Sequence, residues 1–452
     1  MHSEVNETIV AISTPPGRGG IGIVRLSGSR AKEISSPLLK LRGELEHARA
    51  RFAEIIDPGT QTKLDEAVVT YFAAPHSYTG EDIVEIAAHG SPVILDLLVR
   101  QSLAGGARLA NPGEFTERAF LSGRMDLTQA EAVRDLIEAQ TLYQARVAAE
   151  QLGGSLSRRI QPIKQQLVEL IAVLEAGIDF AEDDVDVTPD AQILARIDAM
   201  EQPLSELARS FEQGRIVHSG LALAIVGRPN VGKSSLFNRL VERERAIVTP
   251  IAGTTRDLVT ERVAIGGIPI ELVDTAGLRE SADVVESIGI QKSREALADA
   301  DLVLVVLDST AAVNDEDAAL IGSVADRRAI VVCNKADLAP GATGLDTRMP
   351  IVQTSAVTGE GIDELRSAIL ALVRGAGSGN ESGMLTSLRH QQAVSAALNG
   401  LAAARQAVSA KIPHEMLLLD LYAALRQLDA LTGETTPDDV LNLIFSTFCI
   451  GK

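Results

Sequence analysis

The stretch GRPNVGKS (227–234) decides the fold of the central part of this 452-residue chain. It matches G-x-x-x-x-G-K-S, the phosphate loop of nucleotide triphosphatases, whose glycines let backbone N–H groups point inward at phosphate oxygens. Lys233 adds a positive charge near the β- and γ-phosphates, and the hydroxyl of Ser234 can ligate Mg²⁺. The apolar run LALAIV (221–226) predicts a buried strand before the loop, and SSLFNRLV (234–241) predicts a helix after it. This order predicts an α/β domain that binds a nucleotide.

Two further motifs, each at the end of a predicted strand, indicate a guanine nucleotide. DTAG (274–277) follows the run IPIELV, so Asp274 can hold the water shell of Mg²⁺ and the Gly277 N–H can sense the γ-phosphate. NKAD (334–337) follows AIVVC, and the Asp337 carboxylate would accept from N1–H and N2–H₂ of guanine, which adenine does not offer. Such charge-assisted hydrogen bonds contribute about 1.5–3 kcal/mol each, which is enough to select GTP over ATP.

The remaining contacts to the base are expected from the same strand ends. Asn334 and Lys335 would brace the base and the loop, and a backbone N–H of Ser355 or Ala356, after the run PIVQT, would reach the guanine oxygen. The expected contacts from the phosphate loop and the first turn of its helix are Asn230, Val231, Gly232, Lys233, Ser234 and Ser235.

The residue after DTAG departs from the pattern of many small GTPases. They place Gln there to orient the attacking water, whereas this chain has Leu278, which carries no polar group. Either the domain hydrolyses GTP poorly or another group supplies the function. The nearby candidates are Arg279, Glu280 and Glu286.

Asn230 and the segment TPIAGTTRD (249–257) offer a second clue. An amide oxygen together with loop carbonyls could hold a monovalent cation against the phosphates. The cation would replace an arginine finger, a group that accounts for about 10³–10⁵ in rate. The alternative interpretation is that Asn230 is an ordinary loop residue. Thr255 is the expected second Mg²⁺ ligand, with Thr254 as the less favoured neighbour.

Composition restricts the class of protein. We expect two or three domains because the chain has 452 residues. Their cores should be aliphatic, because hydrophobic residues make up 46% of the chain and aromatic residues only 3%. No apolar run approaches 18 residues, and no basic-then-apolar segment opens the chain. We therefore expect a cytoplasmic protein with neither a membrane span nor a secretory signal. The two cysteines, Cys333 and Cys449, predict no disulfide framework, and Cys333 is expected in a buried strand.

The net charge of −19 disfavours indiscriminate binding of nucleic acid. The acidic stretch DFAEDDVDVTPD (179–190) is interpreted as a solvated linker, with a metal site as the alternative. Residues 227–262 have the opposite charge balance, with seven basic residues and four acidic ones. Any contact with RNA would therefore be local, or shared with a partner.

The patterning divides the chain into four segments. Residues 1–118 combine strand-like runs with a helix that ends near Gly105, which predicts a small α+β domain. Residues 119–216 and 377–452 are helical, and we predict that they build one helical domain around an inserted GTPase domain, 217–376. The predicted fold class is thus multidomain, α/β and α, with an inserted Ras-like phosphate-loop domain whose sheet is mainly parallel. The strand-like runs of the first segment are 8–13, 21–27, 65–73 and 82–89.

Three local signals refine this division. GRGGIG (17–22) fits the dinucleotide fingerprint, but we reject that interpretation because the run after it predicts a strand and not a helix. Thr128 with Glu131 predicts a capping box at the start of a helix. A later helix is expected to stop at Gly433. Its predicted apolar stripe is Leu418, Leu421, Tyr422, Leu425 and Leu428.

Over essentially its full length, the chain resembles the MnmE (TrmE) family of tRNA-modification GTPases. The GTTRD loop is also found in related ribosome-associated GTPases, so the stretches near the two ends discriminate best. Besides the nucleotide motifs, the matching stretches are TIVAISTPPGRGGIGIVRLSG (8–28), HSYTGEDIVEIAAHG (76–90), NPGEFTERAFLSGRMDLTQAEA (111–132), TPIAGTTRD (249–257) and FCIGK (448–452).

The resemblance implies a potassium-activated GTPase that works with a flavin-dependent partner of the MnmG (GidA) type. Together they would add an aminomethyl or carboxymethylaminomethyl group to carbon 5 of the wobble uridine of certain tRNAs. The one-carbon unit would come from 5-formyl- or methylene-tetrahydrofolate, bound by the N-terminal domain, which also forms a homodimer. With the partner, a heterotetramer or larger complex is implied. The implied folate-binding residues are Arg25, Glu85, Lys452 and Arg124, the last standing where some relatives carry Lys.

The resemblance also assigns roles around the nucleotide. Glu286 matches an acid that orients water through an intermediary. Cys449 matches a cysteine important for modification, and is either a thiol nucleophile or a gap-filling side chain. The implied magnesium ligands are Ser234 and Thr255, and the implied potassium ligands are Asn230, Thr249, Ile251 and Thr254.

Two other functions stay open at the level of sequence. A ribosome-assembly GTPase of the related potassium-dependent group would share the nucleotide motifs. It should also carry an RNA-binding module, such as a KH-type G-x-x-G element, or a second GTPase domain, and the sequence has one phosphate loop and no such module. A folate-dependent one-carbon transferase with a regulatory GTP site would modify tRNA without a flavoprotein partner.

The role of Asp337 can be tested by base preference. In Asp337→Asn, the new amide N–H₂ would face the N2–H₂ of guanine, whereas xanthine carries a carbonyl oxygen there. We expect the affinity for GTP to fall by about 10- to 150-fold and xanthosine triphosphate to become the preferred ligand. Competition of both nucleotides against a fluorescent GDP measures this, and unchanged GTP affinity would contradict the role.

Overall fold

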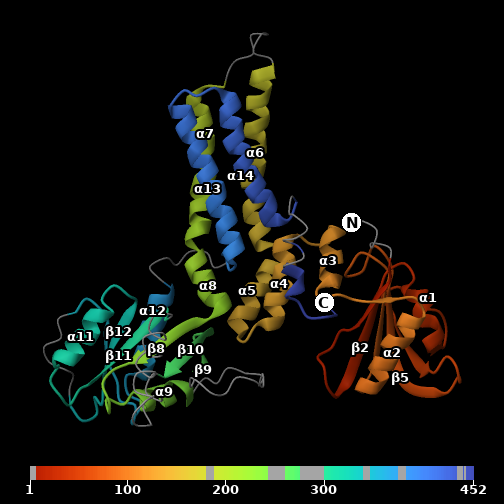
Figure 1. Cartoon of the computed structure of the whole chain (residues 1–452), viewed down its shortest axis with the longest axis horizontal. Coiled ribbons are helices and arrows are strands. Elements are labelled where there is room, and N and C mark those ends of the chain that lie inside the picture. The colour runs from red at the N-terminus through yellow and green to blue at the C-terminus, as the bar shows by residue number, and fades with distance from the viewer. Residues whose placement is uncertain are drawn as a thin grey trace, which may run out of the picture. The chain divides into compact units, whose positions relative to one another are not determined.

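The computed structural model describes residues 7–179, 188–242, 260–274, 300–339, 347–374, 383–434, 441 and 444–451 (Figure 1). They belong to two compact units. The first unit joins Met1–Arg134 to Asp429–Lys452, and the second is Asp135–Leu428. The two ends of the sequence therefore fold together.

A sheet of seven strands, in the order β3-β4-β5-β6-β2-β1-β7, forms the described core of the first unit. Neighbouring strands are antiparallel except β1 and β7. Because side chains alternate along a strand, Val24 and Leu26 of β2 turn to one face, where they share a core with Leu95 and Leu98 of helix α2 (Pro92–Ala104). The strands are β1 (Ile9–Ile12), β2 (Gly19–Ser27), β3 (Leu39–Leu41), β4 (Ala50–Ile56), β5 (Lys63–Phe72), β6 (Ile83–Gly90) and β7 (Arg108–Leu109).

Much of this sheet was predicted. The four strand-like runs are confirmed by β1, β2, β5 and β6, and α2 does end just before Gly105. The strand at Gly19–Ser27 also supports the rejection of a dinucleotide site. Strands β3, β4 and β7 and the short helix α1 (Ala31–Ser35) were not predicted.

The end of the chain packs within the first unit against α3 (Glu114–Leu121) and α4 (Leu127–Glu138). Phe445 and Phe448 share an apolar cluster with Leu127 and Ala130 of α4. Burial of a phenylalanine side chain contributes about 1.5–3 kcal/mol, so these two rings hold the terminal segment in place.

The capping box of α4 lies two residues earlier than predicted. Asp126 Oδ1 accepts from the Gln129 N–H at 2.9 Å, and Gln129 Oε1 accepts from the Asp126 N–H at 3.0 Å. The prediction of Thr128 with Glu131 was wrong. Asp caps as well as Thr, so the sequence offers two overlapping patterns. Packing selects the earlier one, because Leu127 is fully buried and begins the helix.

Long helices make up one part of the second unit. Helix α13 packs along α7, although about two hundred residues separate them in the sequence, and Figure 1 shows α6, α7, α13 and α14 side by side. Arg405 of α13 pairs with Asp198 and Glu201 of α7. The helices are α5 (Leu142–Leu152), α6 (Ser155–Asp179), α7 (Asp190–Arg209), α8 (Phe211–Ser219), α13 (Leu388–Ser409) and α14 (His414–Thr432).

Helix α14 ends just before Gly433, as predicted, but its buried stripe differs from the predicted one. Leu421 and Leu428 of the predicted stripe are buried, whereas Leu418, Tyr422 and Leu425 are only half-buried. The centre of the buried stripe therefore lies slightly to one side of the predicted one, and the period of 3.6 alone could not fix this phase because leucine recurs on several faces. The buried side chains are Leu417, Leu421, Ala424, Leu428 and Leu431.

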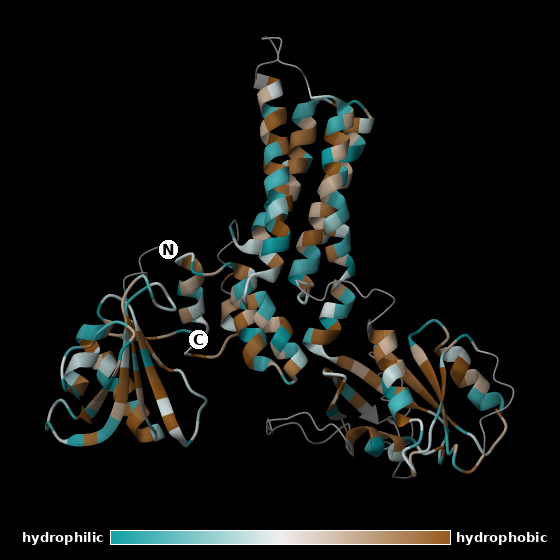
Figure 2. Cartoon of the chain, turned by 180° about the vertical axis from the view of Figure 1, so that it is seen from behind, coloured by the Kyte–Doolittle hydropathy of each residue, from teal (hydrophilic) through white to brown (hydrophobic). Residues whose placement is uncertain are grey.

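A six-stranded sheet lies between α8 and α13 in the sequence, with the strand order β13-β12-β11-β8-β10-β9. All neighbours are parallel except β9, which is the antiparallel edge strand. Figure 2 shows hydrophobic residues running through the strands of both sheets. The predicted runs at 221–226, 268–273, 329–333 and 350–354 coincide with four of these strands. The elements are β8 (Leu221–Val226), α9 (Lys233–Glu242), β9 (Thr260–Ile265), β10 (Ile268–Asp274), β11 (Leu302–Asp308), α11 (Asp315–Ser323), β12 (Ala329–Asn334), β13 (Ile351–Gln353) and α12 (Ile362–Arg374).

The turn between β9 and β10 contacts the start of α5. Thr141 Oγ1 donates to the Gly267 carbonyl at 2.6 Å. Gly267 has φ +84°, and a Cβ there would lie 2.8 Å from the Cβ of Tyr143. Tyr143 in turn packs against the apolar core of the sheet. The turn is therefore fitted closely against the helix.

Within the described ranges, no helix is long and apolar enough to cross a bilayer. Nor do His, Cys, Asp and Glu gather there in a group of three that could hold a metal. Most of the acidic stretch 179–190 lies outside the described residues, so its interpretation as a linker stays a prediction.

The corrected cap can be tested by stability. Asp126→Ala removes the acceptor for the Gln129 N–H, so we expect the free energy of unfolding to fall by about 1 kcal/mol. Asp126→Asn keeps an acceptor and should lose only a few tenths of that amount. Urea unfolding followed by circular dichroism measures both, and equal stability of the alanine variant and the parent chain would contradict the assignment.

Candidate guanine-nucleotide site and a second polar site

The phosphate loop follows β8 and leads directly into α9, as predicted. Lys233, at the first position of α9, donates from Nζ to the carbonyl of Arg228 at 2.8 Å, so the lysine closes the loop. Ser234 and Ser235 are exposed in the first turn of the helix. Asn230 has φ +65°, in the left-handed region, which asparagine adopts more readily than most other non-glycine residues.

One buried amide connects three of the predicted motifs. Asn334 is 2% exposed. Its Nδ2 donates to the Val231 carbonyl in the phosphate loop at 2.9 Å, and its Oδ1 accepts from the Ala356 N–H at 3.1 Å and from Thr354 Oγ1 at 3.4 Å. A Cβ on Gly232 would overlap Nδ2. The second glycine of the loop is thus required by the close approach of Asn334.

Lys335 is held by an aspartate that the sequence analysis did not single out. Its Nζ lies 2.6 Å from Asp308 Oδ2. Burial alone would raise the pKa of Asp308, but hydrogen bonds from Lys335 and Thr310 outweigh it and lower that pKa to about 2. The carboxylate is therefore ionised at neutral pH. Asp308 ends its strand as Asp274 ends β10, and this shared position is the signal that could have identified it.

The expected donors to the guanine oxygen already have acceptors within the protein. The Ala356 N–H donates to Asn334, as described above, and the Ser355 N–H donates to the Glu360 carbonyl at 2.9 Å. A guanine oxygen would compete with Asn334 for the Ala356 N–H. Asp337 is exposed beside this region, so its carboxylate is accessible to a base.

Asp274 is paired in register with Ile225, one residue before the end of β8, so it lies close to the phosphate loop. The position agrees with a role near magnesium. The other predicted residues of this region lie outside the described residues: Thr249, Ile251, Thr254, Thr255, Gly277, Leu278, Arg279, Glu280 and Glu286.

A second polar site lies in the first unit, where Arg25 of β2 faces Glu85 of β6 in register. Arg25 Nε and Nη2 lie 2.9 and 2.8 Å from Glu85 Oε1. The guanidinium stacks 5.8 Å from the ring centre of Tyr78 and 5.5 Å from that of Phe115. These rings favour a cation through their π faces. The site therefore combines a carboxylate, a guanidinium and two aromatic rings.

The last residues of the chain reach this site. The Gly451 carbonyl accepts from Ser13 Oγ at 3.1 Å and from Arg25 Nη1 at 3.4 Å. Cys449 is an exposed free thiol. Lys452 lies outside the described residues. The structure thus brings the terminal FCIGK motif next to β1 and β2, which are more than four hundred residues away in the sequence.

Arg124 and Cys333 complete the predicted set. Arg124 is exposed in the turn between α3 and α4, where its side chain lies near Gly80. Cys333 is buried in β12, so the prediction that it sits in a buried strand is confirmed.

A buried ion network positions α3 beneath the second site, and sequence reasoning missed it. Glu114 Oε1 lies 2.6 Å from Arg108 Nη2 and 2.9 Å from Arg118 Nη2. Burial would raise the pKa of Glu114, but the hydrogen bonds from Arg108, the Asn111 N–H and Arg118 lower it. Arg118 also pairs with Glu81 at 2.9 Å. The network fixes the start of α3, which presents Phe115 to Arg25.

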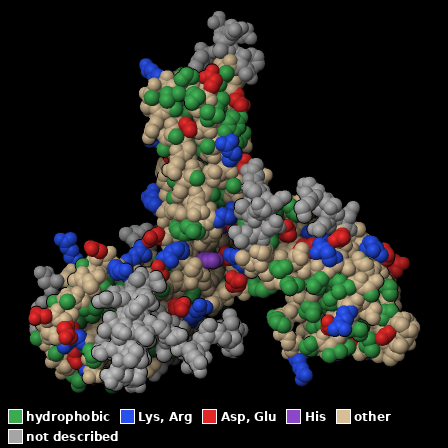
Figure 3. Space-filling model, in the orientation of Figure 1, with side chains coloured by type: hydrophobic (Ala, Val, Ile, Leu, Met, Phe, Trp, Pro, Cys, Tyr) green, Lys and Arg blue, Asp and Glu red, His purple; other side chains and the backbone are tan. Residues whose placement is uncertain are grey.

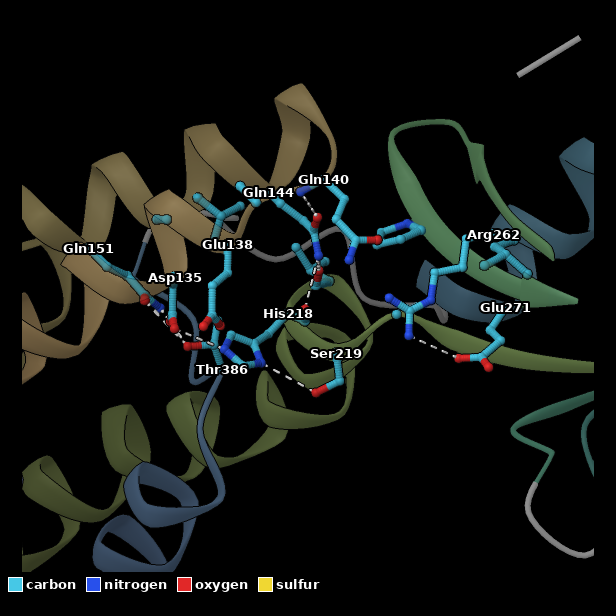
Figure 4. A pocket seen from close by; sticks show the side chains of 17 residues that line it. Asp135, Glu138, Gln140, Gln144, Gln151, His218, Ser219, Arg262, Glu271 and Thr386 are labelled. Atoms are coloured by element: carbon cyan, nitrogen blue, oxygen red, sulfur yellow. Dashed lines mark hydrogen bonds and ion pairs between the residues drawn. The ribbon is translucent and has the colours of Figure 1, made fainter. Parts of the chain in front are cut away.

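A cavity of about 250 Å³ lies elsewhere, where α5 and the end of α8 meet β9 and β10 (Figure 4). His218 Nε2 lies 3.0 Å from Asp135 Oδ1 across it, and Gln144 Nε2 donates to the carbonyls of Val217 and His218, at 2.9 Å each. Its described lining contains none of the residues predicted for nucleotide or folate. These contacts join α4 and α5 to the end of α8, the helix that leads into β8.

Comparison with known proteins gives matches along the whole chain. Residues 8–124 match the family described as GTP-binding protein TrmE N-terminus, and residues 127–449 match the MnmE helical domain. A protein of Koribacter versatilis (strain Ellin345) named tRNA modification GTPase MnmE is 63% identical, covering 99% of this chain and 100% of its own length. The protein of that name from Aquifex aeolicus (strain VF5) is 44% identical, with the same coverage. The solved G domain of the T. maritima FeoB iron transporter is 30% identical and covers 33% of this chain and 96% of its own, with a TM-score of 0.26, too low to carry weight.

The role of Asn334 can be tested against a matched asparagine. Asn334→Ala leaves the Val231 carbonyl without its buried donor, and we expect the affinity for GTP to fall by about 10- to 100-fold. Asn238→Ala, at an exposed position of α9, should leave it unchanged. Titration of a fluorescent GTP analogue compares the two, with thermal melts to show that both are folded. Equal affinities of the two variants would contradict the role.

Proposed function

Since the chain belongs to the MnmE (TrmE) family, and is therefore a GTP hydrolase of tRNA modification, we propose the finer activity that its residues support. With a flavin-dependent partner of the MnmG (GidA) type, it adds an aminomethyl or carboxymethylaminomethyl group to carbon 5 of the wobble uridine of certain tRNAs. GTP hydrolysis is activated by potassium, and the one-carbon unit comes from 5-formyl- or methylene-tetrahydrofolate. The partner and the chain form a heterotetramer or larger complex.

In the proposed mechanism, the chain binds GTP at the ends of the parallel strands. The loop N–H groups and Lys233 bind the phosphates, and Asp337 accepts from the guanine edge. Ser234 and Thr255 would ligate Mg²⁺, with Asp274 behind its water shell. These hard oxygen donors suit that ion, and Ser234 is exposed in the first turn of α9. When bound, Mg²⁺ would neutralise charge on the β- and γ-phosphates.

The proposed potassium site substitutes for the missing glutamine and arginine. Asn230 would hold the cation through its amide oxygen, and its left-handed backbone is consistent with a special position in the loop. The ion would supply the positive charge that an arginine finger brings to the phosphates. Glu286 would orient the attacking water through an intermediary. The other proposed ligands are Thr249, Ile251 and Thr254.

The proposed folate site is the Arg25–Glu85 pair. A carboxylate such as Glu85 accepts two parallel N–H bonds, which fits the amino-pyrimidinone edge of a pterin. Arg25 holds Glu85 in place, and both lie in register on neighbouring strands. Tetrahydrofolate would supply the one-carbon unit there. Arg124 and Lys452 complete the proposed binding set, and Cys449, exposed in the same terminal motif, is proposed as the thiol used in modification.

The proposed homodimer is supported by an open face of the first sheet. Phe52 of β4, Val68 of β5, Ala87 of β6 and Ile23 of β2 are neighbours across the strands. Phe52 is 57% exposed and Val68 46%, and Figure 3 shows groups of hydrophobic side chains on the visible face of this unit. A second copy of the chain is the proposed occupant of this face.

The observation that carries the folate part of the proposal is the meeting of Gly451 with Ser13 and Arg25. It joins the two motifs, one from each end of the sequence, that distinguish this family from other GTPases. The meeting places the Arg25–Glu85 pair beside the terminal motif, as a binding site shared by the two motifs would require.

Both proposed cofactors can be tested in one series. We expect GTP turnover to be at least ten times faster in KCl than in NaCl at equal ionic strength, and tRNA modification to require both the flavoprotein and folate.

Glu85→Gln should weaken tetrahydrofolate binding by about 10- to 150-fold in calorimetry, because a charged hydrogen bond is lost, while GTP turnover is unchanged. Glu66→Gln, in an exposed ion pair of β5, is the control. Equal turnover in the two salts would refute potassium activation, and modification without the flavoprotein would favour a one-carbon transferase.

A further inference from the structure

The second residue of the phosphate loop forms an ion pair with a helix that no sequence motif marks. Arg228 Nε donates to Asp317 Oδ1 at 2.7 Å. Asp317 lies in α11, and its side chain is 2% exposed, whereas the side chain of Arg228 is 27% exposed. This pair is therefore not an ordinary surface ion pair, which would contribute little.

The geometry of Asp317 is fixed by the start of its own helix. Asn314 Oδ1 accepts from the Asp317 N–H at 3.0 Å, and Asp317 Oδ2 accepts from the Asn314 N–H at 3.3 Å, which is a complete capping box. One carboxylate oxygen thus caps α11 while the other receives Arg228. The carboxylate cannot turn away without breaking the cap, so the arginine has a rigid anchor.

Charge explains why the loop needs this anchor. Arg228 stands two residues before Asn230, the proposed ligand of a monovalent cation, and an unpaired guanidinium on the same loop would repel that cation. A guanidinium stays charged at any physiological pH, so the repulsion cannot be relieved by losing a proton. A buried carboxylate neutralises it at short range, where solvent screening is weak.

We propose that Asp317 is a positioning residue for GTP hydrolysis, which neutralises Arg228 so that the phosphate loop can accept a monovalent cation. The inference rests on the proposed potassium activation and adds to it a determinant outside the nucleotide motifs. It also explains how a phosphate loop that contains Arg228 can still depend on an added cation, since the ion pair with Asp317 prevents Arg228 from supplying the positive charge itself.

The proposal predicts opposite effects for the two partners. In Asp317→Asn, Arg228 loses its hydrogen-bonded counter-charge and keeps only the weaker influence of Glu316 and Asp308, and we expect the potassium concentration for half-maximal effect to rise about tenfold. In Arg228→Met, the repelling charge is removed and the side-chain stem is kept, so this concentration should fall or stay the same. The double variant should return to within about twofold of the parent chain. Asp315→Asn, an acid of the same first turn, is the control and should change nothing.

The readout is the affinity of a fluorescent, non-hydrolysable GTP analogue as KCl replaces NaCl at constant ionic strength, with GTP turnover measured alongside. A merely structural role would shift both partner variants in the same direction and lower their melting temperatures equally. That result, or an unchanged potassium response in Asp317→Asn, would overturn the proposal. If Asp317→Asn fails to fold, Arg228→Met decides, because a raised potassium requirement in that variant contradicts charge neutralisation. A parent chain that does not distinguish the two salts refutes potassium activation, and this inference with it.

Discussion

The buried side-chain amide of Asn334 holds together the segments of the candidate nucleotide site. An amide that is excluded from water must find partners for both its donor and its acceptor, or the fold loses about 1–3 kcal/mol. Asn334 finds them in the phosphate loop on one side and in the segment after β13 on the other. Three stretches of chain are thereby held at fixed distances. These segments can meet although they are far apart in the sequence, because the carboxyl ends of parallel strands lie at one edge of the sheet.

Two of the ion pairs in the first unit, Glu114–Arg118 and Arg25–Glu85, differ in how deeply they are buried. Glu114 and Arg118 are 8% and 9% exposed, and each has a further partner, Arg108 for Glu114 and Glu81 for Arg118, so the charges of this buried network compensate one another. Arg25 and Glu85 are 16% and 26% exposed, so their pair contributes less to stability and stays accessible. The first pair builds the support for α3, and the second is available to a ligand.

Several strands and the motifs at their ends could be predicted because the signal for each consists of residues adjacent in the sequence. An apolar run predicts the strand, and the short polar motif after it predicts the candidate site residues at its end. What failed depended on partners distant in the sequence. Thr128 and Asp126 offered equivalent caps, and only the burial of Leu127 decided between them. Asp317 looks like an ordinary surface acid until the fold brings Arg228 to it, and Asp308 is marked only by its position at the end of a strand, since its partner Lys335 is distant in the sequence.

The close fit of Gly267 against Tyr143 restricts how this protein can be rebuilt. The six-stranded sheet is not connected to the helices only through the chain segments at its two ends. The turn between β9 and β10 fits against α5, which precedes it by more than a hundred residues in the sequence. A chimera carrying a foreign nucleotide domain would have to reproduce a glycine in that turn, with the same loop length. Strand β10 runs from this turn to Asp274, which lies close to the phosphate loop. A misfitted turn in such a chimera would therefore displace Asp274 as well.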